Sequence, residues 1–262
     1  MTSATAERRE AGPTLVAMDG VGRRFADGTA ALDGLDLAVR AGEVLSLVGP
    51  SGCGKSTVLR LLAGLDRPSA GRIAWPQGRT EVGFVFQDAT LMPWATAADN
   101  VRLPLRLRGI QRREAAPRVA EALERVGLGR FAGHRPAQLS GGMRMRVSIA
   151  RALVVRPTLL LMDEPFAALD EITRFRLNDD LAALAAALGT TLVFVTHSVG
   201  ESVFLSDRVV VMASHPGRAV AEVAVPGRRA RTREFRTAPA YAALCAETAA
   251  ALRAAMGDEG PP

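Results

Sequence analysis

The stretch GPSGCGKST at residues 49–57 has the residue types and spacing of a phosphate-binding loop. Its Lys55 is the single lysine among the 33 Lys and Arg residues of the chain. A lysine ammonium is compact and mobile, whereas an arginine guanidinium is a wide planar fork, so a tight phosphate cradle needs lysine. The stretch therefore predicts binding of a nucleotide, with Lys55 reaching its β- and γ-phosphates.

The elements on either side of this loop fit such a site. Residues 44–48 form an apolar run that predicts a buried strand, and residues 56–62 predict a helix that ends near Gly64. Glycines allow a tight turn between the two, and a helix N-terminus attracts phosphate through its N–H donors. We expect nucleotide contacts from Gly49, Pro50, Ser51, Gly52, Cys53, Gly54, Lys55, Ser56 and Thr57. Of these, Ser56 is expected to ligate Mg²⁺ through its hydroxyl.

Two carboxylates follow another apolar run, at residues 158–162. Residues at the carboxyl end of a strand face the ligand crevice of an open α/β sheet. We expect Asp163 to hold Mg²⁺, directly or through water. Glu164 is placed to activate an attacking water as a general base.

Two further polar residues close predicted strands. His197 follows the run at 191–196, where an imidazole can bond the γ-phosphate and orient the water. Gln87 ends the run at 82–86, and its amide can ligate Mg²⁺ weakly or hold a water. We place both residues with Glu164 in the predicted catalytic set.

A second anion site is predicted at LSGGM, residues 139–143, before an arginine-rich helix. A serine and two glycines, Ser140, Gly141 and Gly142, at a helix N-terminus offer donors to an anion. One nucleotide does not need two phosphate cradles in one subunit. We therefore infer that this segment serves a nucleotide held by another copy.

Composition narrows the class of protein. The net charge of +6 permits nucleic acid or an anionic membrane as partner, but only residues 228–236 form a basic cluster, with one Phe. We favour a solvated or membrane-facing surface there. Two cysteines give no disulfide framework, and neither a transmembrane run nor an apolar signal core is present, so we expect a cytosolic protein.

Strands that alternate with helices predict an α/β domain with a mainly parallel sheet. The domain is expected at residues 14–225, with a helical lobe inserted at about 95–155. Residues 226–262 are expected to form a C-terminal helical tail whose helix covers 239–256.

The ordered set of motifs resembles the nucleotide-binding subunit of ATP-binding-cassette (ABC) transporters over about residues 14–225. The resemblance implies a P-loop NTPase core with an antiparallel β subdomain. It also implies a head-to-tail homodimer that holds two ATP molecules between one subunit's phosphate loop and the other's signature segment, 139–143. Phe25 stands at the position where the family stacks an aromatic residue, usually tyrosine, on adenine. Ser198, directly after His197, stands at a position where the family usually has aspartate.

Shorter segments resemble importers of nitrate, sulfonate and taurine type. These are Gln87-Asp88, Leu91–Trp94, Asp99–Val101, Met143 and His215–Arg218. The resemblance implies an ATP-hydrolysing subunit, peripheral on the cytoplasmic membrane face. Its partners would be integral-membrane permease subunits and, indirectly, a periplasmic or extracellular solute-binding protein, with no nucleic acid. Residues 88–94 would lie near the groove where the permease docks.

Three alternatives stay open. Importers of a thiamine-precursor pyrimidine share much of this pattern. A non-transport ABC ATPase that acts on nucleic acid or ribosomes usually has tandem cassettes or a long coiled coil, whereas no sustained heptads lie between Gln87 and Ser140. A P-loop kinase or GTPase would leave the signature segment unexplained.

Overall fold

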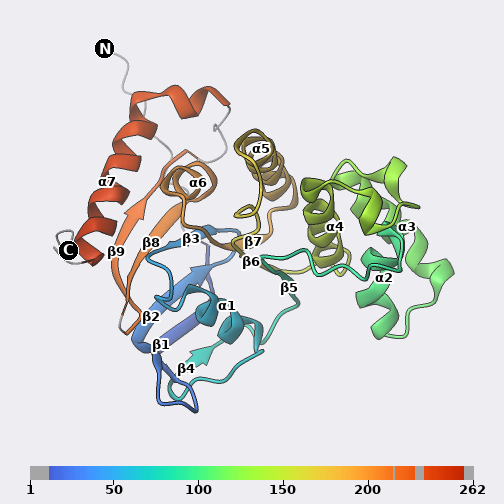
Figure 1. The fold of residues 1–262 in the computed structure, drawn as a ribbon. Helices are drawn as coiled ribbons and strands as arrows, with labels where there is room; N and C mark the ends of the chain where they lie inside the picture. The colour runs from blue at the N-terminus through green and yellow to red at the C-terminus, as the bar shows by residue number, and fades with distance from the viewer. Residues whose placement is uncertain (1–11, 215, 228–232, 257–262) are drawn as a thin grey trace. The chain divides into compact units, whose positions relative to one another are not determined.

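The computed structural model describes residues 12–214, 216–227 and 233–256. The chain divides into two compact units (Figure 1). The first unit comprises the residues up to Gly78 and those from Val193 onward, and the second comprises Arg79–Leu192. The division falls inside strand β7 (Thr191–Val195).

The first unit contains an antiparallel sheet of three strands. In this sheet β1 (Thr14–Arg24) lies between β2 (Ala30–Arg40) and β4 (Ala70–Ala74). In β2, Leu35, Leu37 and Val39 alternate with exposed residues, as expected for a strand with one face on a core. The predicted antiparallel β subdomain is therefore confirmed.

A second set of strands in this unit carries the phosphate loop. Strand β3 (Val44–Val48) is fully buried and pairs in parallel with β8 (Arg208–Ala213), which pairs antiparallel with β9 (Arg218–Ala224). Helix α1 (Lys55–Ala63) follows β3 and ends at Gly64 in a left-handed conformation, as predicted. Helices α6 (Val199–Leu205) and α7 (Pro239–Met256) complete the unit, with α7 beside β8 and β9 (Figure 1).

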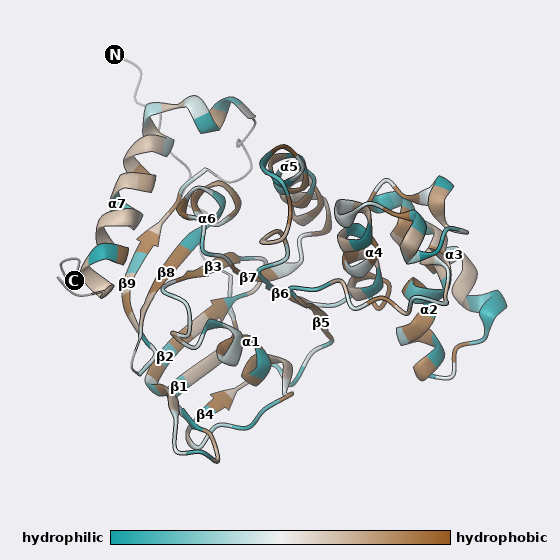
Figure 2. Cartoon of the chain, in the orientation of Figure 1, coloured by the Kyte–Doolittle hydropathy of each residue, from teal (hydrophilic) through white to brown (hydrophobic). Residues whose placement is uncertain are grey.

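The second unit contains the predicted helical lobe. Strands β5 (Val82–Val85) and β6 (Leu159–Asp163) pair in parallel. Its α-helices are α2 (Ala97–Leu107), α3 (Arg112–Arg125), α4 (Gly141–Leu153) and α5 (Glu171–Leu188). Hydrophobic and hydrophilic segments alternate along α2 and α3 (Figure 2). Their apolar residues share one core with α4, to which Val101, Leu123 and Val147 belong.

The start of α5 differs from the sequence-based expectation. Apolar spacing predicts a helix over 175–188, but the helix begins one turn earlier, at Glu171. The reason is the cap: the Asp170 carboxylate accepts a hydrogen bond of 2.9 Å from the Thr173 N–H. This bond lowers the pKa of Asp170.

Candidate functional site

The phosphate loop connects the buried strand β3 to helix α1, and its glycines are required by the surroundings. A Cβ atom on Gly49 would lie 2.6 Å from the Met212 carbonyl oxygen and 2.7 Å from the Cys53 sulfur. Gly54 has φ of +90°, and a Cβ atom there would lie 2.7 Å from the Ala31 carbonyl oxygen. The loop is therefore packed too tightly for side chains at these two positions.

Lys55 lies inside this loop. Its ammonium donates hydrogen bonds of 2.8 Å to the carbonyl oxygens of Gly49 and Pro50 and lies 3.6 Å from the Cys53 sulfur. The residue is only 4% exposed. Because Gly54 precedes α1, no side chain caps the helix start, and Ser56 is exposed there. The loop thus combines a buried cation with an uncapped helix N-terminus.

The first unit also brings His197 to the phosphate-loop edge. The Thr196 N–H donates a 3.3 Å hydrogen bond to the Leu47 carbonyl oxygen, so the carboxyl ends of β7 and β3 are neighbours. His197 follows at once and is exposed. Phe25 follows β1, is 39% exposed, and has the Arg23 guanidinium 5.0 Å from its ring centroid. An adenine would have to use the other face of this ring.

The second unit brings Gln87 and the acid pair to one sheet edge. In the parallel pair of β5 and β6, Val85 is the partner of Met162. Gln87, two residues after Val85, and Asp163, directly after Met162, therefore lie at the same carboxyl edge of this strand pair. Glu164 has φ of +45°, a left-handed conformation that it shares with Thr90 and Arg156 and that costs a non-glycine residue of order 1–3 kcal/mol.

The signature segment lies in the second unit, at the start of α4. The Ser140 hydroxyl accepts a 3.3 Å hydrogen bond from the Met143 N–H and so caps the helix. A Cβ atom on Gly142 would lie 2.8 Å from Thr173 Cγ2, whereas one on Gly141 would make an ordinary 3.4 Å contact with Leu169. Gly142 is thus needed for packing against α5, and Gly141 is not.

Two residues whose structural role sequence reasoning missed hold the segment after Gln87. The Arg151 guanidinium donates 2.8 Å hydrogen bonds to the carbonyl oxygens of Ala89 and Thr90, and burial lowers the pKa of Arg151. Asn100 is fully buried; it accepts from the Met92 N–H at 2.7 Å and donates to the Met92 carbonyl oxygen. In the sequence, Arg151 and Asn100 stand out only as polar residues inside amphipathic helices, and a buried polar side chain needs a hydrogen-bond partner.

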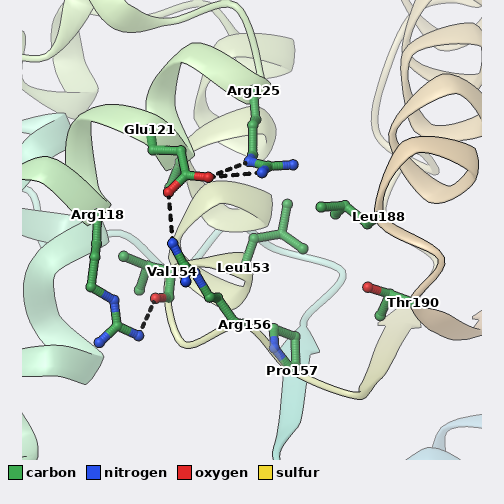
Figure 3. A pocket seen from close by; sticks show the side chains of 10 residues that line it. Arg118, Glu121, Arg125, Leu153, Val154, Arg156, Pro157, Leu188 and Thr190 are labelled. Atoms are coloured by element: carbon green, nitrogen blue, oxygen red, sulfur yellow. Dashed lines mark hydrogen bonds and ion pairs between the residues drawn. The ribbon is translucent and has the colours of Figure 1, made fainter.

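The second unit contains a cavity of about 450 Å³, and Figure 3 shows the side chains that line it. Its charged lining is paired: Arg125 and Arg156 bind the Glu121 carboxylate, and Arg118 donates to the Val154 carbonyl oxygen at 2.9 Å. None of the residues predicted to bind nucleotide lines this cavity. We therefore give this cavity no part in the predicted nucleotide site.

The fold and the phosphate loop define an α/β P-loop NTPase, and comparisons with known proteins narrow this class. The family model for ABC transporters matches residues 32–167. An aliphatic sulfonates import ATP-binding protein of Pseudomonas syringae is 50% identical over 72% of this chain and 77% of its own length. A taurine import ATP-binding protein of Pseudomonas aeruginosa is 48% identical over 75% and 76%.

Solved structures agree with these relatives. A dimeric ATP-binding cassette in a post-hydrolysis state with ADP and Pi has a TM-score of 0.71 and 34% identity, covering 81% of this chain and 99% of that one. The chain therefore belongs to the ABC transporter family. Its activity is that of an ABC ATPase, which binds and hydrolyses ATP, and the two relatives named above are import ATP-binding proteins. None of the described helices is long and apolar enough to cross a bilayer.

Proposed function

We propose that the chain energises uptake of a small solute of the nitrate, sulfonate or taurine type through a separate membrane permease, from the cytoplasmic face. The observation that carries this is the 48–50% identity to sulfonate and taurine import ATP-binding proteins. Because these relatives are named for sulfonate and taurine import, we prefer this solute class to a thiamine-precursor pyrimidine and to work on nucleic acid or ribosomes.

We further propose that two copies form a head-to-tail dimer with two shared ATP sites. In each site, the phosphate loop of one copy, residues 49–57, binds the phosphates and Phe25 stacks on adenine. Ser140, Gly141 and Gly142 of the other copy complete the site. The dimeric form of the similar ATP-binding cassette supports this arrangement. Gly141 supports it too. A side chain would fit at this position within one copy, so packing inside the subunit does not explain the glycine, whereas a nucleotide of the other copy would.

The oxygen donors of Ser56, Asp163 and Gln87 suit Mg²⁺, which prefers such ligands. When bound, Mg²⁺ neutralises charge on the β- and γ-phosphates. Glu164 takes a proton from the water that attacks the γ-phosphorus, while the bond to the β–γ bridging oxygen breaks and ADP leaves. His197 bonds the γ-phosphate and orients this water, and Lys55 offsets the charge on the leaving group.

The segment at residues 88–94 is the proposed contact with the permease. Trp94 is 73% exposed, which is unusual for such a large aromatic side chain. Arg151 and Asn100 fix the backbone that precedes Trp94, through Thr90 and Met92. A permease that binds here would thus act on the segment that begins at Gln87.

Uptake by the reconstituted complex tests this function. The chain is co-purified with its permease, reconstituted in vesicles, and supplied with ATP and candidate solutes. We expect ATP-dependent uptake of nitrate, taurine or an alkanesulfonate, and none with Glu164→Gln. Uptake of a pyrimidine alone, or stimulation of hydrolysis by RNA or DNA in place of a permease, would overturn the proposal.

A further inference from the structure

The turn that carries His197 is closed by a ring of hydrogen bonds. The Thr196 hydroxyl donates to the buried carboxylate of Glu201, and the Ser198 N–H donates to the Thr196 hydroxyl at 3.0 Å. The Ser198 hydroxyl in turn accepts from the Glu201 N–H at 3.2 Å and caps α6. Serine can therefore replace the family's usual aspartate, because its hydroxyl supplies the cap acceptor. The position of His197 is thus tied to the first turn of α6.

The C-terminal helix α7 contacts this same turn. The Tyr241 hydroxyl donates a 3.2 Å hydrogen bond to the Gly200 carbonyl oxygen. A Cβ atom on Gly200 would lie 2.8 Å from the Tyr241 hydroxyl oxygen. Gly200 does not have a positive φ, so its backbone conformation does not require glycine. The glycine instead leaves room for the hydroxyl to approach.

Other contacts hold the tail at this place. The Arg236 guanidinium lies 3.6 Å from the Phe204 ring centroid, and the Phe235 and Tyr241 rings meet edge to face at 5.4 Å. Tyr241 and Val199 both pack against an apolar cluster that includes Val203 of α6, Val209 of β8 and Val223 of β9. Burial, and secondly Cys245, raises the pKa of Tyr241 to about 12. Its hydroxyl therefore keeps its proton near neutral pH and stays a donor.

We propose that Tyr241 is a positioning residue for ATP hydrolysis: through Gly200 it fixes the first turn of α6 and so places His197 beside the phosphate loop. The proposal rests on the role assigned above to His197. It gives the C-terminal tail, which lies outside the nucleotide-binding motifs, a function in the chemical step. Deletion of the hydroxyl alone should therefore affect turnover more than ATP affinity.

The test compares Tyr241→Phe with Thr248→Val in the full chain. Thr248 is the matched control, because its buried hydroxyl lies on the same helix but donates to the Leu244 carbonyl oxygen within α7. We expect Tyr241→Phe to lower kcat about fivefold at unchanged KM for ATP, as for one lost hydrogen bond. Thr248→Val should leave both constants near wild type.

A second readout follows His197 itself without any nucleotide. The chain has 3 histidines, so ring signals of selectively labelled histidine can be assigned by NMR with a His197→Gln variant. Tyr241→Phe should shift the His197 signal and leave that of His134 in place, and Thr248→Val should shift neither. An unmoved His197 signal, or an unchanged kcat, would overturn the inference. Wild-type hydrolysis by His197→Gln would instead contradict the proposed role of His197.

Discussion

The ammonium group of Lys55 donates a hydrogen bond of 2.8 Å to the carbonyl oxygen of Gly49, the residue that opens the phosphate loop. The adjacent carbonyl oxygen, that of Pro50, accepts a second bond of the same length. The ammonium is buried, so these carbonyl oxygens take the place of water around it. A phosphate that enters the loop therefore competes with them for the same donors.

This arrangement predicts that Lys55→Arg lowers ATP hydrolysis by about 100-fold or more, although the charge is kept. The planar guanidinium is too wide for the space between the two carbonyl oxygens and the Cys53 sulfur. Steady-state hydrolysis and ATP binding measure the effect. Arg60→Lys, a swap at an exposed position of the same helix, is the control and should be silent. Wild-type activity of Lys55→Arg would show that the single lysine has no special role.

Glu164→Gln should lower kcat by about 1,000-fold and leave ATP binding intact. Glutamine keeps the size of the side chain and cannot take the proton of the attacking water. Size-exclusion chromatography with ATP should then reveal a stable dimer, because the bound nucleotide is not consumed. Glu171→Gln, in the exposed first turn of α5, should behave as wild type. Rapid turnover by Glu164→Gln would remove Glu164 from the catalytic set.

The two glycines of the signature segment should respond differently to alanine. Gly142→Ala brings a methyl group to 2.8 Å from Thr173 Cγ2 and should lower the free energy of unfolding by about 1–3 kcal/mol. Gly141→Ala makes only an ordinary contact, so it should unfold like wild type but hydrolyse ATP more slowly. Urea unfolding and hydrolysis assays separate the two effects. Equal destabilisation of both variants would refute this division of roles.

Arg151→Met should loosen the segment after Gln87, because it removes the hydrogen bonds to the carbonyl oxygens of Ala89 and Thr90. Hydrogen exchange followed by mass spectrometry should show faster exchange in a peptide that covers residues 87–94. Arg125→Met is the control, since Arg125 pairs with Glu121 on the surface of α3. Unchanged exchange in Arg151→Met would mean that other contacts hold the segment.

The sequence predicts those parts of the fold that local pattern determines. The apolar run of β3, the glycines of the loop and the end of α1 at Gly64 all lie where expected, because each is a property of adjacent residues. The contacts of Arg151 and Tyr241 could not be predicted in this way. Three of their acceptors are backbone carbonyl oxygens, at positions 89, 90 and 200, and every residue type offers the same oxygen.

A local cap decided where α5 begins, since the hydrogen bond from the Thr173 N–H to Asp170 outweighed the weak apolar spacing of the first turn. Two features singled out in the sequence have no structural description. His215 of the importer-like segment and most of the basic cluster, residues 228–232, lie outside the described residues.

The central claim is that each ATP site is shared between two copies of the chain, and mixing two inactive variants tests it most directly. Lys55→Ala removes the phosphate loop's cation, and Gly141→Asp places a negative charge in the signature segment. A mixed dimer then has one site built from two intact halves. We predict recovery of about a quarter of wild-type hydrolysis after random mixing of equal amounts of the two variants. Hydrolysis that stays at the level of the separate variants, with mixed dimers present, would contradict the shared site.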